Sequence, residues 1–226
     1  MNENATLTVN AASGVIGNDD DNASYDSESL AVTNISSNGT SNSGNAAAAI
    51  TGTYGVLTMA ADGSYSYVAN TAAAEALDAD DEVTDVFTYT LKDDADVNSS
   101  TATLTITVTG VDDDPAGVND TGAVNEDKTL TVSTGNGVLS NDTDADDSSS
   151  ISVSAISGGT VGQAKNGTYG VLTLNANGSY AYVANGRSED GLAAGATATD
   201  TFTYTVSDGG GTTDTATLTI TVTGVG

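Results

Sequence analysis

The sequence lacks three residue types on which much enzyme and metal chemistry depends, since its 226 residues include no His, no Cys and no Trp. Without His or Cys there is no Ser-His-Asp triad, no cysteine nucleophile and no zinc site made of imidazole or thiolate ligands. The missing cysteines leave the compartment open. They suit a cytosolic protein, and equally a bacterial extracellular protein that is stabilised in another way.

Basic residues are scarce: four Lys and Arg stand against 31 Asp and Glu, which gives a formal net charge of −27. Nucleic acid is therefore a poor partner, because phosphates need Lys and Arg. No apolar run approaches the roughly 18 residues of a membrane-spanning helix, so we expect no direct membrane insertion. The first residues lack a basic stretch followed by an apolar one, so no secretory signal is expected here, and the chain is interpreted as a piece of something longer.

An internal repeat organises the chain. The run Gly-Thr-Tyr-Gly-Val-Leu-Thr at 52–58 recurs 115 residues later at 167–173, and 63–70 recurs as 178–185. We therefore predict two copies of one module, at 1–111 and 112–226, the first lacking its opening strand. The acidic linker between them, 110–115, holds the only proline, Pro115.

Within each copy the hydrophobic pattern has a period of two, which is typical of strands with one buried and one exposed face. Leu104, Ile106 and Val108 alternate with threonines, and Phe87 and Tyr89 begin another inward row. In the second copy six strands are expected near 129–133, 150–156, 168–174, 179–184, 200–206 and 214–223. A short seventh near 123–125 would bring the two ends of the module to opposite sides. The predicted fold is all-β, with two tandem Ig-like or cadherin-like antiparallel β-sandwiches arranged end to end.

The acidic residues gather in clusters at the expected strand ends. Such crowding costs Coulomb repulsion unless a cation screens it, and calcium takes six to eight oxygen ligands in irregular geometry. With seven strands, the carboxylates of both modules and of the linker would converge on the junction, so Ca²⁺ bound there would set the angle between modules. The candidate metal ligands are Glu3, Asp19, Asp21, Asp80, Asp93, Asp112, Asp113, Asp114, Asp120, Glu126, Asp142, Asp144, Asp146 and Asp208.

A simpler interpretation competes with calcium, because Asp, Asn and Gly favour turns for local backbone reasons and acidic surfaces aid solubility. That explanation suffices for Asp62-Gly63 and Asn177-Gly178. It accounts less well for three consecutive linker acids and an Asp-x-Asp-x-Asp run. An EF-hand is not expected, since position six counted from Asp142 is Asp147 instead of Gly, and position twelve is Val153 instead of Glu.

Several motifs together resemble the VCBS repeat, a cadherin-like module of large bacterial surface adhesins and other RTX-type secreted proteins. They are Val-Asn-Asp at 118–120, Asn-Glu-Asp at 125–127, Gly-Val-Leu-Ser-Asn-Asp-Thr-Asp at 137–144, the Tyr-Gly-Val-Leu-Thr run and Phe-Thr-Tyr-Thr-Val-Ser-Asp at 202–208. The resemblance implies a β-sandwich, an extracellular or cell-surface location, calcium-dependent rigidity and a spacer role in adhesion and biofilm formation. The implied partners are neighbouring repeats of the same polypeptide, with other domains binding the adhesive target.

Other functions compete with that of a spacer. A carbohydrate-binding β-sandwich is the main alternative, although no Trp is present for stacking on a sugar. Paired carboxylates can hydrolyse glycosides, but acids confined to repeated turns are a poor active site, so no enzyme is expected. Ice binding would need the outward threonines of 103–109 to align across several neighbouring strands.

Overall fold

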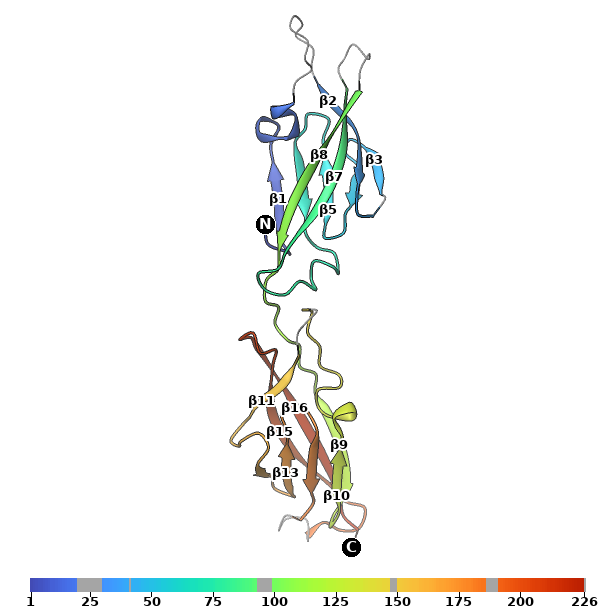
Figure 1. The fold of residues 1–226 in the computed structure, drawn as a ribbon. Coiled ribbons are helices and arrows are strands. Elements are labelled where there is room, and N and C mark those ends of the chain that lie inside the picture. The colour runs from blue at the N-terminus through green and yellow to red at the C-terminus, as the bar shows by residue number, and fades with distance from the viewer. Residues whose placement is uncertain (20–29, 41, 93–98, 147–149, 186–190, 226) are drawn as a thin grey trace, which may run out of the picture. The chain divides into compact units, whose positions relative to one another are not determined.

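The computed structural model describes the chain except residues 20–29, 41, 93–98, 147–149, 186–190 and 226. Asp21 and Asp93 of the candidate ligands thus lie outside the described residues. The chain divides into two compact units, Met1–Val111 and Asp112–Gly226, and each is built almost entirely of strands (Figure 1).

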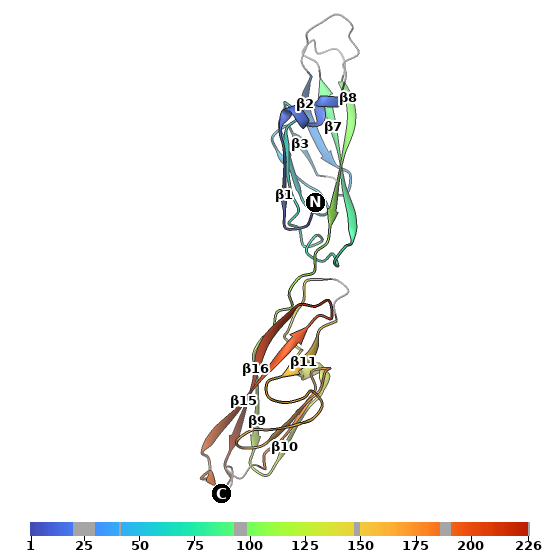
Figure 2. The same cartoon turned by 90° about the vertical axis from the view of Figure 1, so that its left-hand side faces the viewer.

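The first unit packs two four-stranded sheets face to face. In Figure 2, β1 and β8 of this unit lie in opposite layers. One sheet has the order β1 (Thr6–Val9), β6 (Tyr65–Val68), β5 (Val56–Met59) and β4 (Ala49–Thr51). The other has the order β3 (Ser43–Asn45), β2 (Ala31–Ser37), β7 (Glu82–Lys92) and β8 (Ser99–Thr109). Two short 3-10 helices, η1 (Ala11–Ser13) and η2 (Val15–Asn18), follow β1.

The second unit also consists of two four-stranded sheets, but one of them has a different edge strand. One sheet has the order β10 (Thr129–Val132), β14 (Tyr180–Val183), β13 (Val171–Leu174) and β12 (Ala164–Asn166). The other has the order β11 (Ser152–Ile156), β15 (Thr197–Ser207), β16 (Thr213–Thr223) and β9 (Asp120–Asn125). The 3-10 helix η3 (Thr134–Asn136) stands in the place of η1.

Alternation along the strands supplies the core of each unit. Phe87 and Tyr67 are buried in the first unit with ring centroids 6.1 Å apart in an edge-to-face contact, and Phe202 and Tyr182 repeat this in the second at 6.2 Å. Such aromatic pairs contribute about 0.5–1.5 kcal/mol beyond the area they bury. The predicted all-β, two-sandwich class is confirmed within each unit.

Two details of the predicted strands are wrong. First, the second unit has eight strands among its described residues instead of the seven predicted, and the additional one is the short β12. Second, β9 covers Asp120–Asn125 and pairs parallel to β16, so this sheet is not purely antiparallel. The reason is that the chain passes from β9 into the opposite sheet at β10, so no hairpin forces β9 to run against its neighbour.

The strand expected at 168–174 begins only at Val171, because the residues before it form a turn. Gly167 donates its amide hydrogen to the carbonyl of Gly170 at 2.8 Å, and the amides of Thr168 and Tyr169 donate to the buried Asp200 carboxylate at 2.7 and 3.0 Å. The Gly-Thr-Tyr-Gly motif is thus a turn held by a carboxylate from another strand.

The outward faces of the sheets are almost free of charge and rich in hydroxyl groups. On β15 and β16, five threonine pairs stand directly opposite each other, from Thr197 with Thr223 to Thr205 with Thr215. The rows reach β9 only at Thr121, since Ala123 and Asn125 occupy its next outward positions. The multi-strand threonine array that ice binding would require is therefore not formed by this sheet.

Candidate functional site

The acidic segment that opens the second unit is attached to two loops of that unit. The amide of Asp113 donates to the Asp146 carboxylate at 3.1 Å, and the hydroxyl oxygen of Thr212 lies 3.2 Å from the carbonyl oxygen of Asp113. Ala116 then forms an antiparallel bridge with Thr143. These contacts bring the linker acids, the Asp142–Asp146 run and the β15–β16 hairpin to one end of the unit.

The carboxylates gathered there act on one another. Burial raises the pKa of Asp146, as do the neighbouring charges, against a hydrogen bond from the Asp113 amide that lowers it. The pKa of Asp112 is raised by partial burial and then by three like charges, those of Asp208, Asp144 and Asp114. These acids therefore repel one another when ionised, which is the condition that a bound cation relieves.

Two oxygens in this cluster are buried without a hydrogen-bond partner among the described residues: Oδ2 of Asp144 and Oδ1 of Asp146. Asp146 is only 7% exposed. Its other oxygen accepts from Asp113, and Oδ1 of Asp144 accepts from the amide of Asp146 at 3.0 Å. A buried carboxylate oxygen left unsatisfied is costly, so these two atoms are the ones in this cluster with which a cation could interact most favourably.

Deeper in the same end of the unit, Tyr204 joins two more of the candidate acids. Its hydroxyl lies 2.8 Å from Oδ2 of Asp120 and 3.4 Å from Oδ2 of Asp142. Oδ1 of Asp142 accepts from the amide of Val118 at 2.6 Å. Burial is the main cause that raises the pKa of both carboxyl groups. Hydrogen bonds to Tyr204 and to the Val118 amide thus hold these two carboxylates in place beneath the loop.

Asp208 is engaged by its own hairpin. Its Oδ1 accepts from the amides of Gly210 at 2.6 Å and Gly211 at 3.1 Å, and its Oδ2 accepts from the hydroxyl of Thr212. These hydrogen bonds, led by that of Thr212, lower its pKa. Asp208 therefore acts first as the residue that shapes the turn.

The first unit places its candidate acids at both ends. Glu3 accepts from the amide of Val111, and Asp80, in a left-handed conformation with φ of 67°, donates its amide to the carbonyl of Gly110 at 3.2 Å. Both lie where the chain leaves this unit. Asp19 lies at the opposite end and accepts from the Tyr89 hydroxyl at 2.9 Å.

Glu126 in the second unit occupies the position of Glu3. It accepts from the amide of Val225 at 2.6 Å, at the end of the unit that is remote from Asp146. The structure thus separates Glu126 from the cluster around Asp112, Asp144 and Asp146, although both belong to one unit.

Among the described residues, no group of three or more acidic side chains is placed so that it could hold a metal ion. The donor chemistry nevertheless fits calcium at the cluster of the second unit, where hard carboxylate oxygens include the two unpartnered atoms. The described residues also contain no helix long and apolar enough to cross a membrane.

Two important acids were missed from the sequence: Asp85 and its counterpart Asp200, which are 2% and 4% exposed. Each lies on the inward face of a strand, two residues before the buried Phe87 or Phe202. Tyr67 and Tyr182 donate their hydroxyls to them at 2.6 and 2.7 Å. A charged residue in an otherwise apolar inward row is the signal that could have identified them.

Comparison with protein families supports the architecture directly. The model of the bacterial cadherin-like domain matches residues 1–110 and again 112–224. The chain belongs to this family. The two units are therefore consecutive cadherin-like domains, a type of structural and adhesion module. A search of curated protein sequences finds no match.

Solved structures similar to the chain include cadherin ectodomains. Mouse protocadherin PcdhgC3 EC1-3 is 20% identical with a TM-score of 0.39, over 87% of this chain and 56% of that one. Drosophila N-cadherin EC1-4 is 14% identical, with a TM-score of 0.43 and coverage of 87% and 41%. Human mucin-like protocadherin EC1-2 is 14% identical, with a TM-score of 0.44 and coverage of 87% and 84%. The chain thus spans about half the length of the first two structures.

Proposed function

We propose that the two cadherin-like domains are calcium-stiffened spacer modules of a large secreted or cell-surface bacterial adhesin of the RTX type. In this role they project an adhesive domain that supports attachment and biofilm formation. The observation that carries the proposal is the pair of buried, unpartnered oxygens of Asp144 and Asp146 beside the acidic linker segment. Tandem copies of one module and an overall charge of −27 also suit a repetitive extracellular stalk.

The residues of the second unit divide the work of holding such an ion. Asp144 and Asp146 offer the free oxygens, and Asp112, Asp113 and Asp114 add negative charge next to them. Asp120 and Asp142, tied to Tyr204, hold the loop in place from beneath. Bound calcium would supply the positive charge that offsets the repulsion among these groups.

From the first unit, Glu3 and Asp80 remain candidate ligands because they lie where the chain leaves it. We propose that calcium held by the acids of the linker restricts the swing of one module against the next. Replacing Asp112 and Asp113 by Asn should then loosen the connection while each sandwich stays folded.

Resistance to tension also agrees with the strand order of the second unit. Its first strand, β9, lies parallel to its last, β16, over six paired positions from Asp120–Leu218 to Asn125–Thr223. Tension applied to the two ends of the unit therefore loads these backbone hydrogen bonds in shear, so they must break together. A spacer that transmits force gains resistance from that arrangement.

Calcium titration of the intact chain tests the proposal. We expect binding heat in calorimetry and a rise in the melting temperature of the second unit, because a ligand at 100 times its Kd adds about 2.7 kcal/mol to stability. Chelation should reverse the shift, and small-angle scattering should show a wider distribution of module orientations without calcium.

A double variant, Asp144→Asn with Asp146→Asn, should lose most of this gain. Asp127→Asn is the matched control, since Asp127 is exposed, lies beside Glu126 and has a left-handed φ of 58° that Asn tolerates. Absence of binding heat at millimolar calcium, or an equal gain in the double variant, would reject the calcium proposal.

A further inference from the structure

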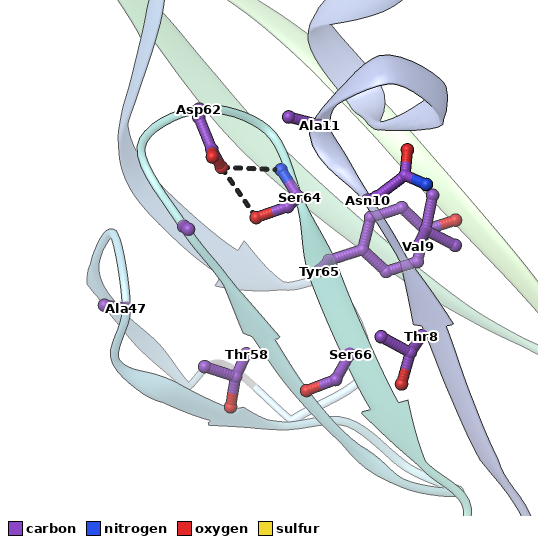
Figure 3. Close-up of a pocket in the computed structure, with 11 residues that line it drawn as sticks. Thr8, Val9, Asn10, Ala11, Ala47, Thr58, Asp62, Ser64, Tyr65 and Ser66 are labelled. Atoms are coloured by element: carbon purple, nitrogen blue, oxygen red, sulfur yellow. Dashed lines mark hydrogen bonds between the residues drawn. The ribbon is translucent and has the colours of Figure 1, made fainter.

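A groove lies on the outer face of the sheet formed by β1, β6 and β5 in the first unit. Its volume is about 490 Å³, within the range typical of small-molecule sites. Thr58, Ser66 and Thr8 face it from three adjacent strands, and the register places Ser66 directly opposite both threonines. Figure 3 shows these three hydroxyl side chains in a row across the sheet.

The rest of the lining is also neutral, apart from one acid. Asn10 lines one side of the groove and Ala47 the other (Figure 3). Ala60 also lines the groove, and its methyl group fills little of it. At the rim, Oδ1 of Asp62 accepts from the amide of Ser64 at 3.0 Å and from its hydroxyl at 2.6 Å. A carboxylate has about four lone-pair positions, so Asp62 keeps acceptor capacity for a ligand. No Lys or Arg lines the groove.

The second unit has the equivalent groove, but it is smaller, at about 350 Å³. Asn175 stands there in the place of Ala60, and its Nδ2 donates to the hydroxyl of Ser179 at 3.0 Å. Ala181 replaces Ser66, so the middle hydroxyl of the row is missing. The groove is therefore open in the first unit and partly filled at the equivalent position in the second unit.

We propose that the groove of the first unit binds a neutral oligosaccharide. Three aligned hydroxyls and an amide can donate to and accept from sugar hydroxyls, and the Asp62 carboxylate adds a strong acceptor. An anionic ligand is disfavoured, because the groove holds a carboxylate and no cation in a chain of charge −27. Binding a neutral sugar on this face desolvates one charge at most.

The test titrates the ¹⁵N-labelled two-unit chain with maltohexaose, cellohexaose and mannohexaose separately, and with an alginate hexamer as the anionic comparison. At least one neutral oligomer should shift the amide signals of Thr8, Thr58 and Ser66. Ala60→Asn should fill the groove and weaken binding about tenfold or more, and Ser66→Ala about three- to tenfold, the effect of one lost hydrogen bond.

The reciprocal variant, Asn175→Ala with Ala181→Ser, should create a second set of shifts in the second unit. Thr203→Val is the control and should leave binding unchanged, because Thr203 lies on the outer face of β15, in the sheet of the second unit that does not line the groove. Groove signals unmoved by all three neutral oligomers, equal affinity in Ala60→Asn, or alginate binding as tight as the neutral oligomers would each overturn the proposal. Unchanged melting temperatures of the variants exclude misfolding as a cause.

Discussion

Removing the buried carboxylate of Asp200 should unfold the second unit at markedly lower denaturant concentration and leave the first unit unaffected. Asp200 is 4% exposed and holds three donors: the amides of Thr168 and Tyr169 and the hydroxyl of Tyr182. It thereby fastens the Gly167–Gly170 turn of one sheet to the β15 strand of the other. Asp85 does the same in the first unit, where it also accepts from the amide of Gly55 at 3.1 Å.

The magnitude follows from those donors. In Asp200→Ala the buried Tyr182 hydroxyl loses the acceptor that Asp200 provides, which costs about 1–3 kcal/mol. The two turn amides regain water in part, so the loss of each of their hydrogen bonds costs about 1 kcal/mol. We therefore expect a loss of about 3–5 kcal/mol, a large share of the roughly 5–15 kcal/mol typical of a domain. Asp200→Asn keeps one acceptor oxygen and should lose about 2 kcal/mol.

Denaturant unfolding of the two-unit chain measures this, provided that the transitions of the units are assigned by NMR. Asp85→Ala is the mirror experiment and should shift the other transition by a similar amount. A loss below about 1 kcal/mol in Asp200→Ala would refute the reasoning, because the donors would then have found other partners. A joint shift of both transitions would refute the independence of the two cores.

Three further predictions concern the second unit. Without calcium, the free energy of unfolding of the second unit should increase as the pH falls from neutrality towards about 4, and unfolding measured at several pH values checks this. The reason is that acids whose folded pKa is raised above 3.8 destabilise the fold once they are ionised. These acids are Asp112, Asp120, Asp142 and Asp146. A stability that only declines on acidification would contradict this. Gly137→Ala should cost about 2–3 kcal/mol in thermal unfolding, since its Cβ would lie 2.3 Å from the carbonyl oxygen of Gly178, whereas Gly135→Ala, with open space around it, should be nearly neutral. Tyr204→Phe should cost about 1–2 kcal/mol in denaturant titration by depriving Asp120 of its hydroxyl donor, and an unchanged midpoint would show that this hydrogen bond contributes nothing.

The sandwich of each unit was predictable because its strands alternate clearly. Leu104, Ile106 and Val108 face inward as expected, and Asp62-Gly63 and Asn177-Gly178 form the hairpin turns, with both glycines at positive φ. A period of two reports directly on burial, so it survives without any knowledge of the neighbouring strands.

Features that depend on distant partners were not predictable in the same way. The sequence of the Gly-Thr-Tyr-Gly segment predicts the start of a strand, whereas its amides form a turn because they donate to Asp200. Likewise, the spacing of Asp112, Asp144 and Asp146 suggests a cluster, but only the contacts of Asp113 show which loop receives the linker. The local sequence pattern predicts on which face of a strand a side chain lies, whereas its hydrogen-bond partners depend on how the loops pack.

The placement of charge connects both proposals. The four sheets keep their outer faces almost free of charge and covered with Thr and Ser, while the acids are concentrated in the segments that join the strands. A carboxylate on a face could be solvated by water alone. A carboxylate in a loop next to other carboxylates is stabilised by hydrogen bonds, as both oxygens of Asp208 are within its own hairpin, or by a cation. Asp144 and Asp146 each have one oxygen bonded to an amide and one that could bind a cation. This division of the surface concentrates the acids at the strand ends, where we propose that calcium binds, and leaves the neutral faces available to ligands that carry no charge.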